Sequence, residues 1–260
     1  MKKIITTLLI ALFAISSSYA GPKEIMKKGE YLKYEVSFLG VSLGTIEMSI
    51  EDESEYNDKK VYNVKADIAT YDGIPFVDLK ATFKSWLDES INHSHKFTSN
   101  MKKGDEKWEY MQLLMDYDEM EIHQKVWENK ELQKEDTIDI EKKINDGSSL
   151  FYLARQYTGL KRSIMVPTII NGQIFDTKLN FRNEIESVEI DAVEYPIRTK
   201  YFDGQADWEG LYGLSGRFEG WFSDDDASIP VVAKMNIYVG KVHIELIEWT
   251  REGWTPPKGD

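Results

Sequence analysis

The sequence alternates apolar and polar residues in many short segments, and this pattern constrains the fold more than any other feature. It is clearest at residues 32–38, where the even positions are apolar and the odd positions are polar. A period of two residues is typical of a strand with one buried face. Strands are therefore expected at 32–38, 45–50, 61–70, 76–87, 93–101, 108–115, 120–127, 164–170, 174–183, 187–192, 195–202, 216–223, 229–239 and 241–249.

One segment breaks this period. Apolar residues at 150, 153, 154 and 157 have helical spacing, which predicts a helix over Leu150–Tyr157. Asp146 or Ser148 can cap its start, and Gly159 can end it. Because the helix is apolar over much of its circumference, it is expected to be buried. The chain is thus predicted to be mainly β, with one large antiparallel sheet, half-open or closed like a barrel, curled around one buried helix.

Several segments lack a clear period. Residues 51–60 are predicted to be a charged loop, and 203–215 a glycine-rich loop. Residues 130–143 are predicted to be a solvated connection with an irregular strand near 137–140. Asn171-Gly172 is a strong hairpin-turn signal.

The first 20 residues have the features of a secretory signal peptide. Lys2 and Lys3 precede an apolar run at 4–15, and small residues at Ser18 and Ala20 follow. The run is shorter than the roughly 20 apolar residues that span a bilayer. Cleavage is expected after Ala20, with export to the periplasm and residues 21–260 as a single β-rich domain without stable membrane insertion.

Composition excludes several classes of protein. The chain has no cysteine, so disulfides, thiol catalysis and a lipid attached to an N-terminal cysteine are excluded. Its net charge is −13, which disfavours nucleic acid as a partner because phosphate backbones are also negative.

Three segments together resemble a known bacterial family. They are Gly29–Val36 with Leu39–Gly44, the helix entry Asp146–Arg155, and Trp221–Asp226 with Ile229–Val231. They are similar to the domain-of-unknown-function family 3108, over about residues 29–248. The resemblance implies an exported envelope protein and supplies no reaction or substrate. The expected architecture is also similar, at the level of the fold, to carriers that move lipoproteins across the periplasm.

Aromatic and large apolar residues are candidates to line an interior cavity. A cavity of this kind would bind a lipid or another apolar ligand. The alternative is that these residues fill a closed core. The candidates are Phe83, Trp86, Trp108, Tyr110, Leu150, Phe151, Leu153, Phe181 and Trp221.

Two groups of residues resemble parts of metal sites. His93 and His95 alternate on an expected strand, so they share a face, but their spacing reveals no third ligand. Asp203 and Asp207 belong to a run with oxygen ligands at every second residue, which lacks the Gly and Glu positions of a calcium loop. No metal and no other cofactor is expected.

No catalytic motif stands out. The sequence has no Gly-x-Ser-x-Gly motif and no phosphate-binding glycine motif. The leading hypothesis is a non-catalytic periplasmic binding or carrier protein for an apolar ligand or an envelope polymer. The alternatives are an envelope hydrolase with paired carboxylates and a structural partner of an outer-membrane assembly.

Overall fold

A computed structural model describes residues 21–75, 78–104, 106–210, 215–237 and 240–260. The expected signal peptide at 1–20 lies outside the described residues, as do parts of the strands expected at 76–87 and 229–239. The described elements are α1 (Pro22–Ile25), β1 (Tyr31–Phe38), β2 (Val41–Tyr56), β3 (Lys59–Thr70), β4 (Lys80–Asp88), β5 (Ser94–Lys102), β6 (Trp108–Asp116), β7 (Glu121–Glu128), β8 (Glu131–Asp139), α2 (Gly147–Tyr157), β9 (Arg162–Ile170), β10 (Gln173–Val188), β11 (Ile197–Ala206), β12 (Gly216–Ser223), β13 (Pro230–Asn236) and β14 (Lys241–Thr250).

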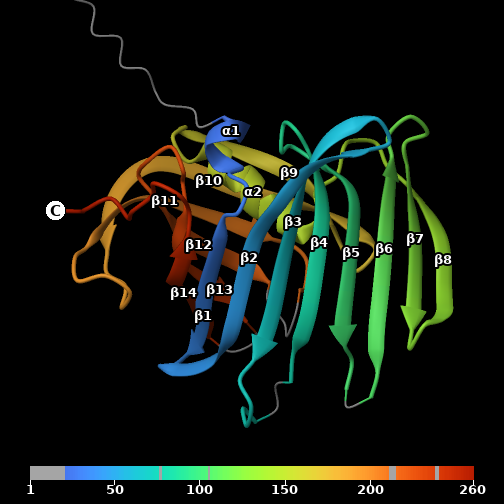
Figure 1. The fold of residues 1–260 in the computed structure, drawn as a ribbon, viewed down its shortest axis with the longest axis horizontal. Coiled ribbons are helices and arrows are strands. Elements are labelled where there is room, and N and C mark those ends of the chain that lie inside the picture. The colour runs from blue at the N-terminus through green and yellow to red at the C-terminus, as the bar shows by residue number, and fades with distance from the viewer. Residues whose placement is uncertain (1–20, 76–77, 105, 211–214, 238–239) are drawn as a thin grey trace, which may run out of the picture.

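The described strands form one antiparallel sheet. Its order is β8-β7-β6-β5-β4-β3-β2-β1-β14-β13-β12-β11-β10-β9. Strands β1–β8, here called the N-terminal arm, and β9–β14, the C-terminal arm, are each built from neighbours in sequence (Figure 1). The arms meet where β1 pairs with β14, with Leu32 opposite Trp249. Because β8 and β9 are edges that do not pair, the sheet is open. The curled antiparallel sheet predicted from the sequence is confirmed in its half-open form.

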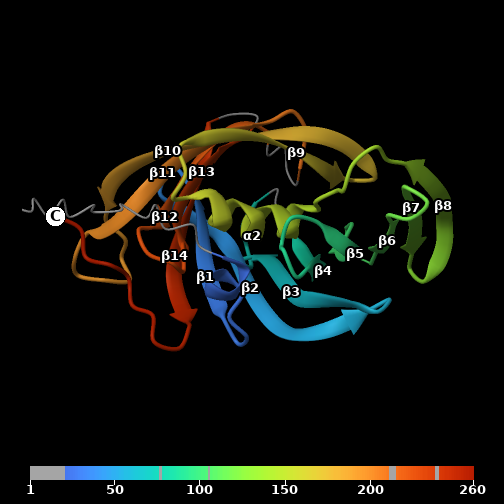
Figure 2. The same cartoon turned by 90° about the horizontal axis from the view of Figure 1, so that it is seen from above.

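Helix α2 lies inside the curl, between the two arms (Figure 2). The chain reaches it from β8 at one edge of the sheet and leaves it toward β9 at the other edge. Asp146 caps its start, since one carboxylate oxygen accepts hydrogen bonds from the backbone nitrogens of Ser148 and Ser149 at 2.8 and 2.9 Å. The same oxygen accepts a bond from Ser85 of β4, and Asn145 pairs with Thr168 of β9. The helix start is therefore attached to both arms.

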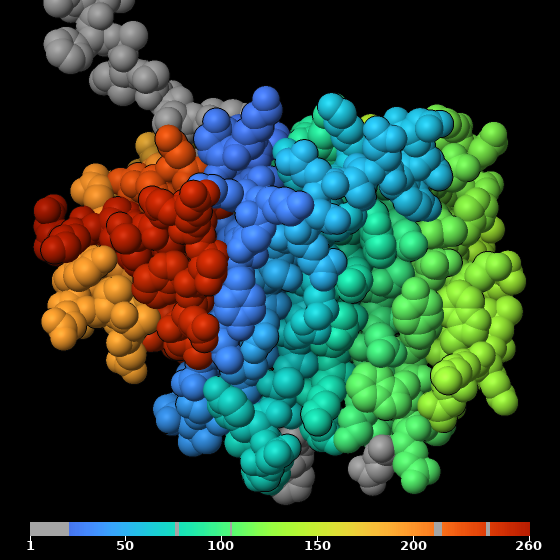
Figure 3. Space-filling view, in the orientation of Figure 1, coloured from blue at the N-terminus to red at the C-terminus, as the bar shows by residue number. Residues whose placement is uncertain are grey.

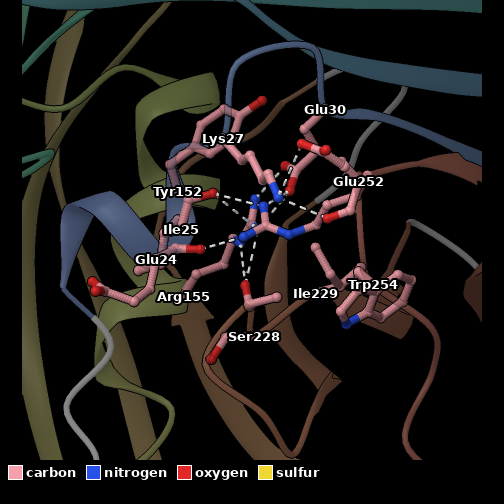
Figure 4. Close-up of polar contacts among 12 residues, drawn as sticks. Glu24, Ile25, Lys27, Glu30, Tyr152, Arg155, Ser228, Ile229, Glu252 and Trp254 are labelled. Atoms are coloured by element: carbon pink, nitrogen blue, oxygen red, sulfur yellow. Dashed lines mark hydrogen bonds and ion pairs between the residues drawn. The ribbon is translucent and has the colours of Figure 1, made fainter.

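A buried group of charges holds the other end of α2 (Figure 4). The Arg155 guanidinium forms a two-pronged ion pair with Glu30, at 2.6 and 3.0 Å, and neither side chain is more than 1 % exposed. Arg155 also donates to the carbonyl oxygen of Ala227, and Arg251 pairs with the same Glu30 carboxylate. One cluster thus joins α2 to the chain before β1, the loop before β13 and the segment after β14.

The strands follow the predicted pattern closely where one face is apolar and the other polar. Strands β6 and β7 begin or end within one residue of the expected segments, and the Asn171-Gly172 turn joins β9 to β10. Both turn residues have positive φ, 52° and 75°, as this kind of hairpin turn requires. The predicted helix begins three residues earlier than Leu150, at Gly147.

Four expectations for irregular segments are wrong. Residues 51–60 extend β2 and β3 into one long hairpin that turns at Asn57-Asp58. The connection at 130–143 contains β8, a regular edge strand whose side chains are mostly exposed. The strand expected at 174–183 continues through a bulge to Val188 as β10, whereas residues 189–192 of the strand expected at 187–192 lie in the connection that follows. Strand β11 runs through the first residues of the expected loop at 203–215.

None of the helices among the described residues is long and apolar enough to cross a membrane.

Candidate functional site

Two apolar cavities lie beside α2, inside the curled sheet. The C-terminal cavity has a volume of about 250 Å³ and is bounded by α2, β1, β2 and the C-terminal arm. The N-terminal cavity has a volume of about 280 Å³ and is bounded by α2, strands β2–β6 and the start of the β9–β10 turn. Among the described residues, neither cavity has a charged side chain in its lining. Such a lining favours an apolar ligand, because an ion would lose its hydration without gaining a partner.

Phe151 contributes to both cavities. It lines both of them, together with Ile46, Met48, Gly147 and Trp208. Its ring packs edge-on against Tyr34 of β1 and against its neighbour Tyr152, at centroid distances of 6.4 and 5.1 Å. The two cavities are therefore neighbours that share part of their apolar lining, and Phe151 is the large helix side chain that both have in common.

Two glycines in the C-terminal arm shape the wall of the C-terminal cavity. Phe218 of β12 lies opposite Gly204 of β11, and Phe202 of β11 lies opposite Gly220 of β12. A methyl group at Gly204 would come within 2.1 Å of the Phe218 ring, and one at Gly220 within 2.4 Å of the Phe202 ring. The absence of side chains lets both rings lie across the neighbouring strand, where they line the cavity.

The polar groups near the cavities differ in how well they are satisfied. The indole nitrogen of Trp208 donates to the Thr177 hydroxyl at 2.8 Å, and the Tyr34 hydroxyl donates to the Pro230 carbonyl oxygen at 3.0 Å. The Ser99 hydroxyl, in the lining of the N-terminal cavity, is buried and has no hydrogen-bond partner among the described residues. It is the polar atom best placed to meet a polar group of a ligand.

The structure distributes the nine candidate lining residues among three environments. Phe83, Leu150 and Phe151 line the cavities. Leu153 and Phe181 pack in a buried cluster with Val166 and Phe222 instead. The outer face of the sheet carries the other four, Trp86, Trp108, Tyr110 and Trp221, because in each strand they alternate with residues that face inward. Trp108 and Tyr110 are exposed there, whereas Trp221 is partly buried and packs against the main core cluster. Figure 3 shows this outer face for the N-terminal arm.

The outer face carries a shallow hollow of about 690 Å³ over β5–β7 and the following turn. Tyr110 and Trp127 lie opposite each other on β6 and β7, with ring centroids 5.4 Å apart. Trp108 is 39 % exposed, which is a large exposure for this residue type. The hollow is a second place where aromatic side chains are available to a partner.

His93 and His95 come together with Asp88 at the β4–β5 turn. The Oδ2 atom of Asp88 lies 3.6 Å from Nε2 of His93 and 3.2 Å from Nε2 of His95. Burial lowers the pKa of His93 to about 4 and also lowers the pKa of His95. Burial acts to raise the pKa of Asp88, but hydrogen bonds from Ser90 and the two nearby histidines together outweigh it, and the pKa is lowered. The sequence indicated the two histidines, whereas Asp88 is brought to them only by the turn.

Asp203 and Asp207 do not converge on a common point. Asp203 lies in β11 and forms an ion pair with Arg182 of β10, with the Arg182 Nε atom at 2.7 Å. It also accepts a hydrogen bond from Asn180. Asp207 is exposed and accepts a bond from Gln205. The carboxylate of Asp203 is thus already matched by a cation.

Comparison with solved structures shows similarity in fold. The β-barrel-like protein of domain of unknown function DUF1849 from Brucella abortus aligns with a TM-score of 0.56 at 10% identity, over 87% of this chain and 98% of that one. A protein described as exported, with a YmcC-like fold, from Bacteroides fragilis has a TM-score of 0.38 at 9% identity, over 87% and 98% of the two chains. A protein described as a lipoprotein, from Parabacteroides distasonis, has a TM-score of 0.35 at 9% identity, over 87% and 97%.

The sequence itself matches one family. No curated protein is significantly similar to the chain. The family model described as protein of unknown function (DUF3108) matches residues 33–247, which include all of the strands from β2 to β13 and the helix between the arms. The segments that suggested this resemblance, at 29–44, 146–155 and 221–231, lie largely inside the match. The chain therefore belongs to the DUF3108 family.

Proposed function

We propose that the protein is a non-catalytic binding protein of the bacterial envelope that holds an apolar ligand, such as an acyl chain, beside α2. The observation that carries the proposal is the pair of adjoining apolar cavities, whose lining contains no charged side chain among the described residues. Within the part of the chain that the structure describes, no carboxylate lines either cavity, which favours binding over hydrolysis by paired carboxylates at this place.

The size of the space fits this class of ligand. Each cavity alone is slightly smaller than the ~300–1,000 Å³ typical of small-molecule sites, and the two together reach that range. Each methylene transferred from water into such a space gains ~0.8 kcal/mol. A chain with about ten buried methylenes would gain roughly 8 kcal/mol before the cost of association, which is itself at least about 4 kcal/mol. The net gain from the methylenes alone is then at most about 4 kcal/mol, which corresponds to a Kd of about 1 mM or weaker, so tighter binding requires further contacts such as one with the ligand's polar end.

The test is titration of the purified protein, residues 21–260, with a fluorescent fatty acid. We expect saturable binding, and competition by fatty acids without the fluorophore. Phe151→Ala should change both the affinity and the preferred chain length, because it removes a large ring from the lining of both cavities. Tyr110→Ala is the matched control, since it removes an aromatic ring from the outer face, and it should bind as the unmodified protein does. Absence of saturable binding by the unmodified protein would refute the proposal.

The proposed location is the periplasm, with the signal peptide removed after Ala20. The features that support it are the basic start, the apolar run and the small residues before Gly21. The intact mass of the protein isolated from the envelope fraction should correspond to a chain that begins at Gly21. Retention of Met1 on protein from the cytoplasmic fraction would contradict it.

The outer aromatic hollow supports a second candidate function, that of a docking partner within an envelope assembly. Its exposed Trp108 and its neighbours Tyr110 and Trp127 have the composition of residues that anchor protein interfaces. In crosslinking from intact cells, a photoreactive residue at position 110 should then capture a specific envelope protein, and Trp108→Ala should reduce the yield. Fatty-acid binding without such a crosslink would favour the carrier function alone.

A further inference from the structure

The strongest unassigned group of side chains lies at the β4–β5 turn. Asp88 is the last residue of β4, His95 is the second residue of β5, and His93 is in the turn between them. Each offers one possible ligand atom, and these three atoms all lie within 4.8 Å of one another. The two imidazole rings are buried, and the carboxylate is partly exposed.

The distances between these atoms suit one shared cation. Zinc binds nitrogen and oxygen ligands at about 2.0–2.2 Å, so neighbouring ligand atoms in a tetrahedral site are separated by roughly 3.3 Å. The separations between Asp88 Oδ2 and the two Nε2 atoms are 3.2 and 3.6 Å. The ligand atoms of the two histidines lie within 4.8 Å of each other, so rotation of the imidazole side chains would bring all three ligand atoms to bonding distance from one ion.

Surrounding groups hold the ligands in this orientation. The other carboxylate oxygen of Asp88 accepts hydrogen bonds from the Ser90 hydroxyl and from the Ser90 backbone nitrogen, the latter at 3.0 Å. This leaves Oδ2 directed at the histidines. The Tyr117 ring packs edge-on against both imidazoles, and its hydroxyl donates to the carbonyl oxygen of Ser94 at 2.6 Å. Such supporting contacts are typical of built metal sites.

Lys143 lies at the open side of the group. Its ammonium is 3.2 Å from Nε2 of His93, where it donates to the imidazole lone pair that a metal would use. Lys143 is an exposed residue, so its side chain can turn into solvent when an ion enters. The Lys143 ammonium therefore competes with a metal ion for the lone pair of His93 Nε2.

We propose that Asp88, His93 and His95 form a binding site for a divalent transition-metal ion of the zinc type. Two imidazoles and one carboxylate are a ligand set for such ions, and three protein ligands leave a fourth position open to water or to an anion. The site is independent of the apolar cavities. The sequence-based expectation of no metal depended on the lack of a third ligand, and Asp88 provides one.

The test is isothermal titration of the chelator-treated protein with ZnCl₂, followed by titration with CoCl₂ monitored in visible light. We expect one equivalent of zinc, and a cobalt spectrum typical of four or five ligands that include nitrogen. Asp88→Asn and His95→Gln should each weaken binding at least tenfold. Lys143→Gln should strengthen it severalfold, because it removes the competing cation. His123→Gln, which changes an exposed histidine on β7, is the control and should bind normally.

Three outcomes would overturn the proposal. They are the absence of stoichiometric zinc binding, binding that is unchanged by Asp88→Asn, and binding that is lost in His123→Gln. If His95→Gln does not fold, zinc binding by Asp88→Asn and Lys143→Gln still tests the proposal. Both variants are expected to fold, because each change is at a residue with exposed side-chain surface.

Discussion

The buried charge cluster at the end of α2 leads to a quantitative prediction about Glu30→Gln. This change keeps the size of the side chain and an oxygen acceptor, but removes the carboxylate charge that, among the described residues, pairs with both Arg155 and Arg251. Arg155 is fully buried and the Arg251 side chain is 7 % exposed, so two guanidinium groups would remain close together without a counter-ion. Removing one partner of a buried ion pair costs about 3–5 kcal/mol, and we expect a loss of this size.

Substitutions of the other residues in the cluster should lower the free energy of unfolding less than Glu30→Gln does. Arg251→Met leaves the pair between Glu30 and Arg155 intact, so it should lose only about 1.5–3 kcal/mol, the contribution of a hydrogen bond to a charged group. The double variant Glu30→Gln with Arg155→Met should be more stable than the sum of the two single changes predicts, since it removes both charges.

The assay is unfolding in urea, with the midpoint and the slope determined for each variant. Glu128→Gln is the matched control. Glu128 and Lys107 form an exposed ion pair at 2.9 Å, and breaking such a pair should cost at most about 1 kcal/mol. The reasoning is refuted if Glu30→Gln costs no more than this control, or if Arg251→Met costs as much as Glu30→Gln.

Three further predictions concern the core, the cavity wall and the helix cap. Leu153→Ala should lower the free energy of unfolding in urea by about 2–5 kcal/mol because Leu153 is packed in the core; a loss below about 1 kcal/mol would contradict this. Gly220→Ala should cost about 1–3 kcal/mol in the same assay, because the new methyl group would meet the Phe202 ring at 2.4 Å, and an unchanged midpoint would show that the ring moves freely. Burial raises the pKa of the Asp146 carboxyl group, so the folded protein binds a proton there more tightly than the unfolded chain does. As the pH rises from about 4 through the raised pKa, the free energy of unfolding of the unmodified protein should therefore fall relative to that of Asp146→Asn. A relative stability that rises with pH over this range would contradict the assignment.

Much of the sheet could be predicted from the sequence because most strands have one apolar face. The sequence pattern does not predict the outer part of the β2–β3 hairpin at residues 51–60, and it predicts a solvated connection in place of β8. Both segments are polar on both faces, and a strand with no buried face has no hydrophobic period. Their pairing is held by backbone hydrogen bonds to a neighbouring strand, which the side-chain pattern does not reveal.

The candidate cavity was harder to predict, because aromatic residues occur on both faces of the sheet. In β6 the outward-facing Trp108 and Tyr110 come before Met111 and Leu113, which are buried. The sequence shows that such residues alternate but not which set faces α2. The position of the helix decides this, and it depends on contacts far apart in the chain, such as that between Ser85 and Asp146. Asp88 was missed for a related reason, since only the geometry of the turn brings it to His93 and His95.

The position of the β1–β14 pair has a consequence for how the chain can be cut and rejoined. This pair is where the two arms meet, and it brings Tyr31 opposite Thr250. A circular permutant that began near α2, ran through β14 into β1 and ended after β8 would have every described strand beside its neighbour in sequence. Its contacts would be more local than those of the natural order, and local contacts speed folding. In the natural order, by contrast, the strands that join the two arms come from opposite ends of the sheet-forming chain, so the junction between the arms cannot form until the last strand has been made.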